Sequence, residues 1–320
     1  MNYLLVAAGF VLLLLGGEFL VRGAVALARR LEVSPLIIGL TIVAYGTSAP
    51  ELLVSLEAHL GGASGIAIGN VVGSNIANIL LIVGCAALIR PVSCARECLR
   101  LNEPVVVGAT AALALLGLTG SVTVWASVPM LIFLAGFTVY SYWAERRSLA
   151  RGDPEAAMLL HEVEEFEDGP KHPLLIGAAL AGGLVGVLCG SDFLVDGAAG
   201  LARSFGVSEA TIGLTIVAIG TSLPELATSV IAALRRHGDV ALGNVLGSNI
   251  FNILAIMGIL PLFKPLPIPQ DVATFDMWLM LGITVFFVGW AVAFRRIGRP
   301  LGLLFVLGYA AYIGAVFLGV

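Results

Sequence analysis

The sequence of 320 residues predicts an all-α polytopic membrane protein, with ten transmembrane helices arranged as two inverted repeats of five. Its composition is 59% hydrophobic and only 12% charged, with a mean hydropathy of +1.02, whereas soluble domains carry about 25% charged residues. Apolar runs of roughly 20 residues recur, which is enough to cross a hydrocarbon core ~30 Å thick. The runs are continuous instead of alternating, and the backbone must satisfy its own hydrogen bonds in lipid, so the spans are predicted to be helices.

The breaks between the apolar runs define ten predicted spans. They lie near residues 3–28, 35–59, 64–89, 103–119, 122–143, 173–202, 208–234, 239–263, 274–294 and 299–319. An acidic linker at 145–172 separates the first five-helix repeat, over 1–144, from the second, over 173–320. The first span is expected to be a helix of the mature protein, because it lacks the positively charged start of a signal peptide and has a copy later in the chain.

The basic residues predict the orientation of the spans. Fourteen of the seventeen Lys and Arg residues fall on the face that holds the linker. They are Arg29, Arg30, Arg90, Arg96, Arg100, Arg146, Arg147, Arg151, Lys171, Arg235, Arg236, Arg295, Arg296 and Arg299. By the positive-inside rule this face is cytoplasmic, which places both termini outside the cytoplasm. The sequence thus predicts a multi-pass protein of the plasma (inner) membrane.

Segments of the first half recur in the second in a constant register, without an insertion or deletion between them. The repeated pairs are Ile38–Ala44 with Ile212–Ala218, Gly46–Glu51 with Gly220–Glu225, and Gly73–Ile76 with Gly247–Ile250. Each half holds an odd number of helices, so the second copy enters the membrane from the opposite face. Inverted repeats of this kind are typical of secondary transporters, whose sites lie near the midplane where the repeats meet.

Two acidic residues, Glu51 and Glu225, lie in the middle of apolar helices at equivalent places in the repeats. An acidic residue at a helix centre costs ~2.5–3.5 kcal/mol on insertion scales. No Lys or Arg lies nearby at similar depth, so a cation from solution is the natural partner. The preceding Pro50 and Pro224 each remove a backbone donor, which predicts kinked second and seventh helices.

Oxygen atoms around the two carboxylates complete a predicted cation site. The candidates are the hydroxyls of Thr47, Ser48, Thr221 and Ser222, the carbonyls of Ala44 and Ala218, and the side chains of Ser74, Asn78, Ser248 and Asn252. Ca²⁺ binds six to eight such oxygens, and two carboxylates neutralise one Ca²⁺. Ser and Asn side chains also bond membrane helices to one another, so a structural role for Ser74 is the alternative.

The sequence resembles the cation/Ca²⁺ exchanger superfamily, and within it the prokaryotic sodium/calcium exchangers. The resemblance rests on the motif G-T-S-x-P-E, which occurs twice, each time followed by G-S-N-I-x-N, and it spans nearly the whole chain. It implies exchange of Ca²⁺ for Na⁺ by alternating access, with helices 1 and 6 sliding over the other eight. It also implies that Glu51 and Glu225 are ligands shared by Ca²⁺ and Na⁺.

Asn252 departs from the pattern of that superfamily, in which well-studied archaeal and potassium-dependent members have an aspartate at this place. The cavity then holds two acids instead of three, and Ca²⁺/H⁺ exchange becomes the main alternative, since a buried glutamate can also bind a proton. A passive cation channel is a third reading. No single nucleophile or cofactor motif indicates an enzyme, no basic patch with aromatic residues indicates nucleic acid, and no obligate protein partner is expected.

Three further acids, Glu18, Asp192 and Asp196, lie deep in helices 1 and 6, where they have either a structural role or a place on an ion pathway. Arg22, one turn from Glu18, is a candidate partner for it. Glu57 and His59 have no counterpart in the second repeat and are predicted to be solvated at the outer end of helix 2.

Overall fold

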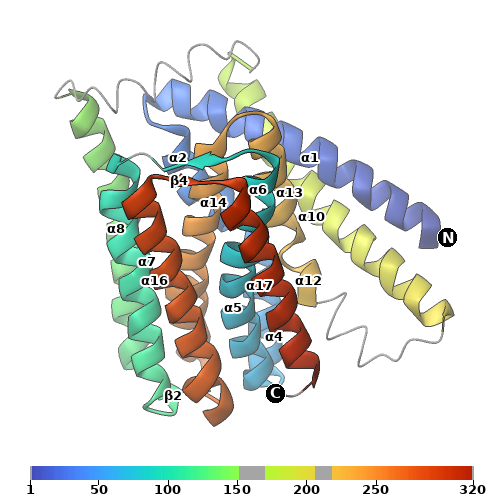
Figure 1. Cartoon of the computed structure of the whole chain (residues 1–320), viewed down its shortest axis with the longest axis vertical. Helices are drawn as coiled ribbons and strands as arrows, with labels where there is room; N and C mark the ends of the chain where they lie inside the picture. Colours follow the sequence, from blue (N-terminus) through green and yellow to red (C-terminus); the bar gives the residue numbers. More distant parts are fainter. Residues whose placement is uncertain (1, 95, 151–169, 206–217, 319–320) are drawn as a thin grey trace.

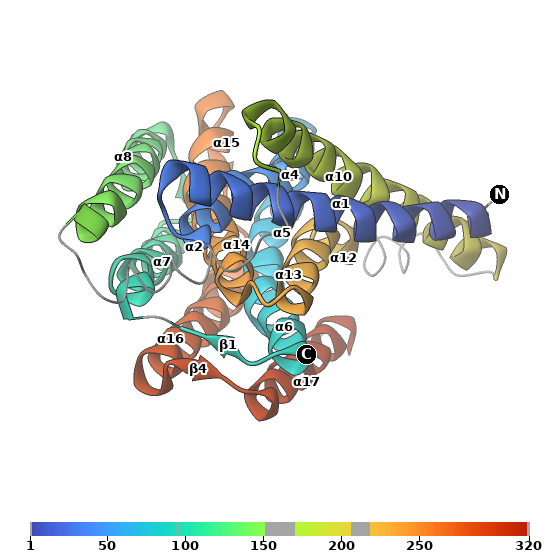
Figure 2. The same ribbon diagram turned by 90° about the horizontal axis from the view of Figure 1, so that it is seen from above.

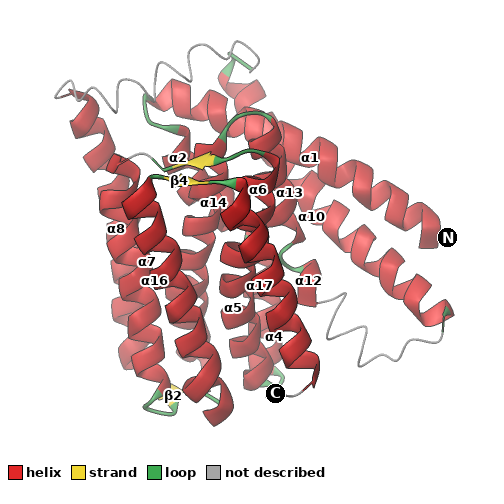
Figure 3. Ribbon diagram, in the orientation of Figure 1, coloured by secondary structure: helices red, strands yellow, loops and turns green. Residues whose placement is uncertain are grey.

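The computed structural model of the chain is built almost entirely of helices, which run side by side in a bundle (Figures 1 and 3). It describes residues 2–94, 96–150, 170–205 and 218–318. Two short antiparallel ribbons join helix ends: Val92 pairs with Ile297, and Val122 pairs with Leu266. The predicted all-α polytopic membrane fold is therefore confirmed.

The helices of the first half follow the predicted spans closely. They are α1 (Asn2–Leu31), α2 (Pro35–Ile38), η1 (Gly39–Val43), α3 (Ala44–Thr47), α4 (Ala49–Leu60), α5 (Ser64–Ala77), η2 (Asn78–Val83), α6 (Gly84–Ile89), α7 (Arg96–Gly117) and α8 (Val124–Ala150), where η marks π-helical turns. The strands β1 (Val92–Ser93) and β2 (Ser121–Val122) lie between them.

The second half repeats this order. Its helices are α10 (Pro173–Ser204), α12 (Ala218–Gly220), α13 (Leu223–Leu234), α14 (Gly238–Phe251), η4 (Asn252–Ile256), α15 (Met257–Phe263), η5 (Val272–Asp276), α16 (Met277–Phe294) and α17 (Arg299–Leu318). The strands are β3 (Leu266–Pro267) and β4 (Arg296–Ile297). The first part of the predicted span 208–234 lies outside the described residues.

Within the described residues, seven helices are long and apolar enough to cross a membrane. The pair Pro35–Thr47 and Ala49–Leu60, bent by 40° at its break, makes an eighth. Asn102–Gly117 and Leu223–Leu234 are shorter apolar helices. The structure thus accounts for seven or eight spans, and the count of ten remains a prediction.

Helix α8 extends to Ala150, into the first part of the predicted linker 145–172. Its last turns are held by contacts with the connection between α1 and α2. The Glu145 carboxylate accepts a hydrogen bond from the backbone N–H of Ser34, 2.7 Å away, and Arg146 pairs with Glu32 at 3.3 Å. The Arg147 guanidinium lies 3.3 Å from the centre of the Trp143 ring. These contacts explain why the helix continues beyond its apolar segment.

Helices α1 and α10 lie against each other and cross the bundle at a steep angle (Figures 1 and 2). Glycines allow their backbones to touch: a side chain at Gly183 would meet the backbone of Leu20 and Gly16. Gly9 and Gly190 make a similar approach further along the pair. Small residues of this kind are the usual means of close helix packing in membranes. The hydrophobic effect does not drive helices together in lipid, so association depends on close van der Waals contact.

We expect Gly183→Ala to destabilise this helix pair, because its added methyl group would overlap backbone atoms that cannot rotate away. Overpacking of this kind costs about 1–3 kcal/mol. The neighbouring Gly182 offers a matched control, since nothing lies within 4 Å of its added methyl group. Thermal unfolding of the purified variants should show a lower Tm for Gly183→Ala only. Equal melting of the two variants would contradict the packing described.

Helix α14, with η4 and α15, lies at the centre of the bundle, and 83% of its most apolar stretch is buried. Gly243 and Gly247 face the backbone of Leu36 and Leu40 so closely that no side chain fits between them. Gly247 opens one of the segments that the two halves repeat.

Candidate cation site

The predicted span 35–59 breaks at Ser48, between α3 and α4, and the predicted span 208–234 breaks at Ser222, before α13. Both serines leave the helical conformation with ψ near zero, at 7° and 4°. A proline follows each break at the start of the next helix, where its missing N–H does no harm. Glu51 and Glu225 consequently lie in the first turns of α4 and α13, a position in which the helix dipole favours a negative charge.

Each glutamate is bonded to the serine at the break of the opposite half. The hydroxyl of Ser48 donates to Glu225 Oε1 at 2.8 Å, and that of Ser222 lies 3.4 Å from Glu51 Oε1. The Ser74 hydroxyl lies 3.4 Å from that of Ser222. Both glutamates are 1% exposed. The structure therefore brings together five of the predicted ligands, from both repeats, in one buried cluster.

Several buried oxygens of the predicted ligands have no hydrogen-bond donor among the described residues. They include Oε2 of both Glu51 and Glu225, Oγ of Ser248, and Oδ1 of both Asn78 and Asn252. A buried acceptor without a donor costs about 1–3 kcal/mol, and more when it is charged. No described salt bridge reaches either glutamate. Unpaired buried oxygens of this kind, both carboxylate and neutral, fit a hard cation such as Ca²⁺.

Asn78 and Asn252 begin the π-helical segments η2 and η4. Asn78 Nδ2 donates to Asn249 Oδ1 at 2.9 Å, and Asn249 Nδ2 lies 3.4 Å from the carbonyl of Asn75. Neither polar atom of the Asn252 side chain has a partner among the described residues. Two equivalent positions thus differ: the Asn78 amide bonds to Asn249 of the other half, whereas both amide atoms of Asn252 lack a partner among the described residues.

The predicted carbonyl ligand Ala44 stays within the helical hydrogen-bond pattern. It accepts from the Ser48 N–H at 3.0 Å, and the Thr47 hydroxyl lies 3.3 Å from the same oxygen. A lone pair of Ala44 is available to a cation when Thr47 donates instead to Asn244 Oδ1, 3.2 Å away. Ala218 begins α12, directly after the residues that the structure leaves undescribed.

Two asparagines that the sequence did not assign to the site, Asn70 and Asn244, hold the broken helices in place. Asn244 Nδ2 lies 3.3 Å from the carbonyl of Glu225 and 3.0 Å from the hydroxyl of Ser229. Its Oδ1 accepts from Thr47 of the other half. Asn70 makes the same three contacts with Glu51, Ser55 and Thr221. The signal was present, since the two asparagines occupy equivalent positions in the repeated segments.

Asn244→Ala should lower the stability of the protein by about 2 kcal/mol, because it removes one donor and one acceptor at a position that is 0% exposed. Thr47 and Ser229 would each lose a partner. The change is read from thermal unfolding in detergent, with Thr274→Ala as the control, whose exposed hydroxyl bonds only to its own helix. Equal Tm values for the two variants would remove Asn244 from this role.

The carbonyl of Gly220, which Pro224 leaves without its helical donor, accepts a hydrogen bond from Ser191 of α10 at 2.7 Å. The helix pair α1–α10 is thus joined to the break beside Glu225. At the equivalent place in the first half, α1 has Gly17, which has no hydroxyl.

The other polar residues singled out in the sequence lie away from the two glutamates. Glu18 is ion-paired with Arg22 of its own helix and with Arg235, at 2.7 Å, which agrees with a structural role. Asp192 and Asp196 are exposed on α10. Glu57 is exposed, as predicted.

The prediction for His59 was wrong, because the structure shows this residue to be 0% exposed. Its Nδ1 lies 2.9 Å from the Ser64 hydroxyl, and its Nε2 lies 3.0 Å from the carbonyl of Lys264. Lys264 belongs to the second half of the chain, so no local pattern indicated this partner.

The sequence matches the family described as sodium/calcium exchanger protein over residues 1–143 and 175–318. The chain belongs to the sodium/calcium exchanger family. Relatives in this family cover almost its full length. The inner membrane protein YrbG of Escherichia coli (strain K12) is 34% identical over 98% of this chain and 96% of its own. The sodium/calcium exchanger MaX1 of Methanosarcina acetivorans is 31% identical, with coverage of 99% and 98%.

Among solved structures, the sodium-calcium exchanger NCX_Mj, soaked without Na⁺ and Ca²⁺, superimposes with a TM-score of 0.83. The two chains are 32% identical, and the alignment covers 98% of each. The exchanger family expected from the repeated motifs is thus confirmed, and with it a multi-pass integral membrane protein.

Proposed function

We propose that this exchanger-family protein is a secondary active antiporter that exchanges Ca²⁺ for Na⁺ by alternating access. The observation that carries the proposal is the buried pair Glu51 and Glu225, each bonded to a serine of the opposite half. Each glutamate also has one oxygen without a partner among the described residues. The similarity to MaX1 and NCX_Mj, both described as sodium/calcium exchangers, supports the proposal. Ca²⁺ and Na⁺ are the transported ions in this proposal, and no cofactor is involved.

The ligand set proposed for these ions joins the two carboxylates with oxygens of both halves. It comprises Glu51, Glu225, Thr47, Ser48, Thr221, Ser222, Ser74, Ser248, Asn78, Asn252 and the carbonyls of Ala44 and Ala218. One Ca²⁺ would be coordinated by both carboxylates and would neutralise their two negative charges. Na⁺ ions would share the same carboxylates, so that binding of one kind of ion requires release of the other.

The proposed architecture comprises ten spans in two inverted repeats, with both termini outside the cytoplasm of a plasma (inner) membrane. Support comes from the bonds between the halves, in which Asn70 and Asn244 play mirrored parts. Alternating access would then arise from movement of α1 and α10 as a pair. Figure 2 shows these two helices side by side along one flank of the bundle, where glycine contacts hold them together.

Ca²⁺/H⁺ exchange is the second candidate, and Asn252 is the observation that favours it. This amide, 1% exposed, adds no negative charge to the pair of glutamates, so the charge available for Na⁺ is limited to that of the two carboxylates. Protons could then compete with Ca²⁺ directly for the carboxylate oxygens.

Radioactive Ca²⁺ uptake into proteoliposomes of the purified protein tests both candidates. Uptake is driven separately by an outward Na⁺ gradient and by an outward H⁺ gradient. Uptake with Na⁺ alone would support the proposal, and uptake with H⁺ alone would support the alternative. Uptake that only follows the Ca²⁺ gradient, with no uphill movement under either condition, would indicate a passive channel and overturn both.

A dependence of transport on pH between about 6 and 8 should not arise from His237, in the turn after α13. Burial and the charges of Arg235 and Arg29 lower the pKa of His237 to about 4, although Glu18 opposes them. The imidazole is therefore neutral throughout this range. His237→Gln should leave the shape of the pH profile of Ca²⁺ uptake unchanged, and a shifted profile would show that His237 titrates there.

A further inference from the structure

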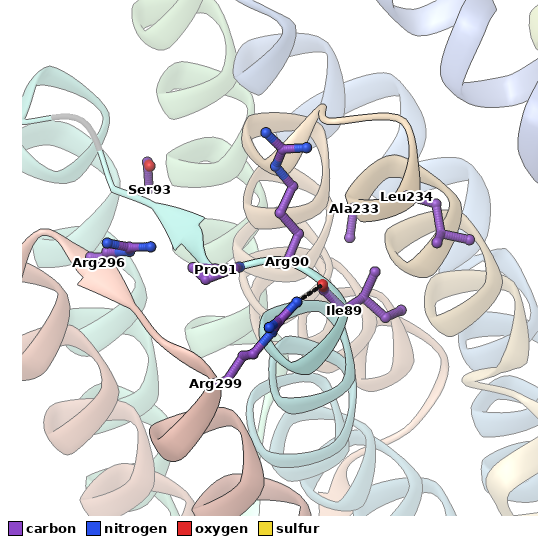
Figure 4. A pocket seen from close by; sticks show the side chains of 8 residues that line it. All are labelled: Ile89, Arg90, Pro91, Ser93, Ala233, Leu234, Arg296 and Arg299. Carbon is purple, nitrogen blue, oxygen red and sulfur yellow. Dashed lines mark hydrogen bonds between the residues drawn. The ribbon is translucent and has the colours of Figure 1, made fainter.

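A hollow of about 670 Å³ opens where the β1–β4 ribbon meets the ends of α6, α13 and α17, away from the cation site. It is lined by Ile89, Arg90, Pro91, Ser93, Ala233, Leu234, Arg296 and Arg299 (Figure 4). Three of these lining residues are arginines and none is acidic. The positive charge gathers on the face that the distribution of basic residues predicts to be cytoplasmic.

The three arginines come from three segments that are fixed relative to one another. Arg296 lies in β4, opposite Ser93 of β1, and the Cys94 N–H donates to the carbonyl of Arg295 at 2.9 Å. Arg90 directly follows α6. Arg299 begins α17 and donates to the carbonyls of residues 88 and 89, at 3.1 and 3.3 Å, which closes the end of α6. The ribbon and the bonds of Arg299 thus fix the backbone segments from which the three arginines line the hollow.

No carboxylate of the described residues pairs with these arginines. Arg90 and Arg296 make no described side-chain hydrogen bond or ion pair, and Arg299 bonds only to neutral carbonyls there. By contrast Arg146 and Arg235 on the same face are both paired with glutamates. Guanidinium groups bind phosphate oxygens in parallel pairs of hydrogen bonds, and the Ser93 hydroxyl adds a further donor.

The residues around the hollow point to a lipid headgroup as the source of a phosphate that these arginines would bind. The indole N–H of Trp290 bonds to the carbonyl of Arg296 at 3.3 Å, and tryptophan is enriched at the level of lipid headgroups. The opposite wall is apolar, and its Leu234 is 57% exposed, as Phe294 beside the ribbon is 61% exposed. We propose that Arg90, Arg296 and Arg299 bind the headgroup phosphate of an anionic phospholipid, whose glycerol and acyl portion lies against this apolar wall.

Binding of a short-chain lipid to the purified full-length protein in detergent tests the site. Thermal unfolding is followed while dioctanoyl phosphatidylglycerol, dioctanoyl phosphatidylcholine or inorganic phosphate is added. Phosphatidylglycerol should raise Tm, because a ligand of the folded state alone stabilises it. The zwitterionic lipid should raise Tm less. Stabilisation by inorganic phosphate at the same concentrations would overturn the lipid as the source.

The variant Arg90→Gln/Arg296→Gln should raise the concentration of phosphatidylglycerol needed for a given rise in Tm by about twenty-five-fold, since each arginine near an anionic surface contributes about a fivefold factor. The side chains are exposed and make no described contact, so the variant should fold. Arg30→Gln/Lys171→Gln removes two exposed charges from the same face outside the hollow and should respond as the unchanged protein does. Equal weakening in both variants would overturn the site in favour of a general surface charge.

Discussion

Glu51→Gln is expected to abolish Ca²⁺ transport in proteoliposomes, with a loss of more than about a hundredfold. Substitution even of residues that only support metal ligands costs about 10–100-fold in affinity, and here a proposed ligand itself loses its charge. The Gln side chain keeps the shape of the glutamate and can still accept the hydrogen bond from Ser222. The fold should therefore survive, and Glu225→Gln should behave in the same way.

The control is the response of the folded protein to the ion itself. Ca²⁺ should raise the Tm of the unchanged protein, because it binds the folded state, and should leave the Tm of Glu51→Gln unchanged. In the absence of Ca²⁺ the variant should melt no lower than the unchanged protein, since a buried unpaired carboxylate oxygen has been replaced by an amide. Robust transport by both glutamine variants would show that the ions bind elsewhere.

Asn252→Asp should shift coupling toward Na⁺. The side chain is buried and has no partner among the described residues, so a carboxylate there would add a third charge to the proposed ligand set. An added charge a few ångströms away strengthens cation binding by more than about 1 kcal/mol, even at an effective dielectric constant near about 20. We expect the Na⁺ concentration for half-maximal exchange to fall about tenfold.

Asn78→Asp provides the matched variant, because it introduces the same charge at the equivalent position of the first repeat. In the unchanged protein the Asn78 amide donates to Asn249 Oδ1 at 2.9 Å. An aspartate at position 78 would replace this donor by an oxygen, so that two oxygens would repel each other there. This variant should lose stability in thermal unfolding, whereas Asn252→Asp should not. Unchanged Na⁺ dependence in Asn252→Asp would remove Asn252 from the mechanism.

The repetition in the sequence was sufficient to find the two glutamates and the breaks before them. A carboxylate in an apolar helix has a large cost, and its appearance at equivalent places in both repeats left few structural explanations. The cross-pairing could not be derived in this way. The hydrogen bond from Ser48 to Glu225 depends on how the two halves pack, and no local sequence pattern predicts it.

Neutral amides and imidazoles were harder to interpret than charges. Asn70 and Asn244 occupy equivalent positions in the two halves, as the glutamates do. The free-energy cost of placing a neutral amide in a membrane helix is small, however, so such a residue can serve either helix packing or ion binding. Their positioning role appears only when their partners are seen. His59 was placed in solvent for a related reason, since a polar residue near a helix end is usually exposed unless a distant segment covers it.

The bond from Ser191 to the Gly220 carbonyl makes the two halves unequal. If α1 and α10 slide past the broken helices, movement on the second side must break a hydrogen bond that Gly17 cannot form on the first. One such bond contributes about 1 kcal/mol net, which is about a fivefold population ratio. The inward-open and outward-open states would then differ in free energy before any ion binds. An exchanger built from a duplicated half would thus rest preferentially in one state and bind its ions with different apparent affinities from the two sides of the membrane.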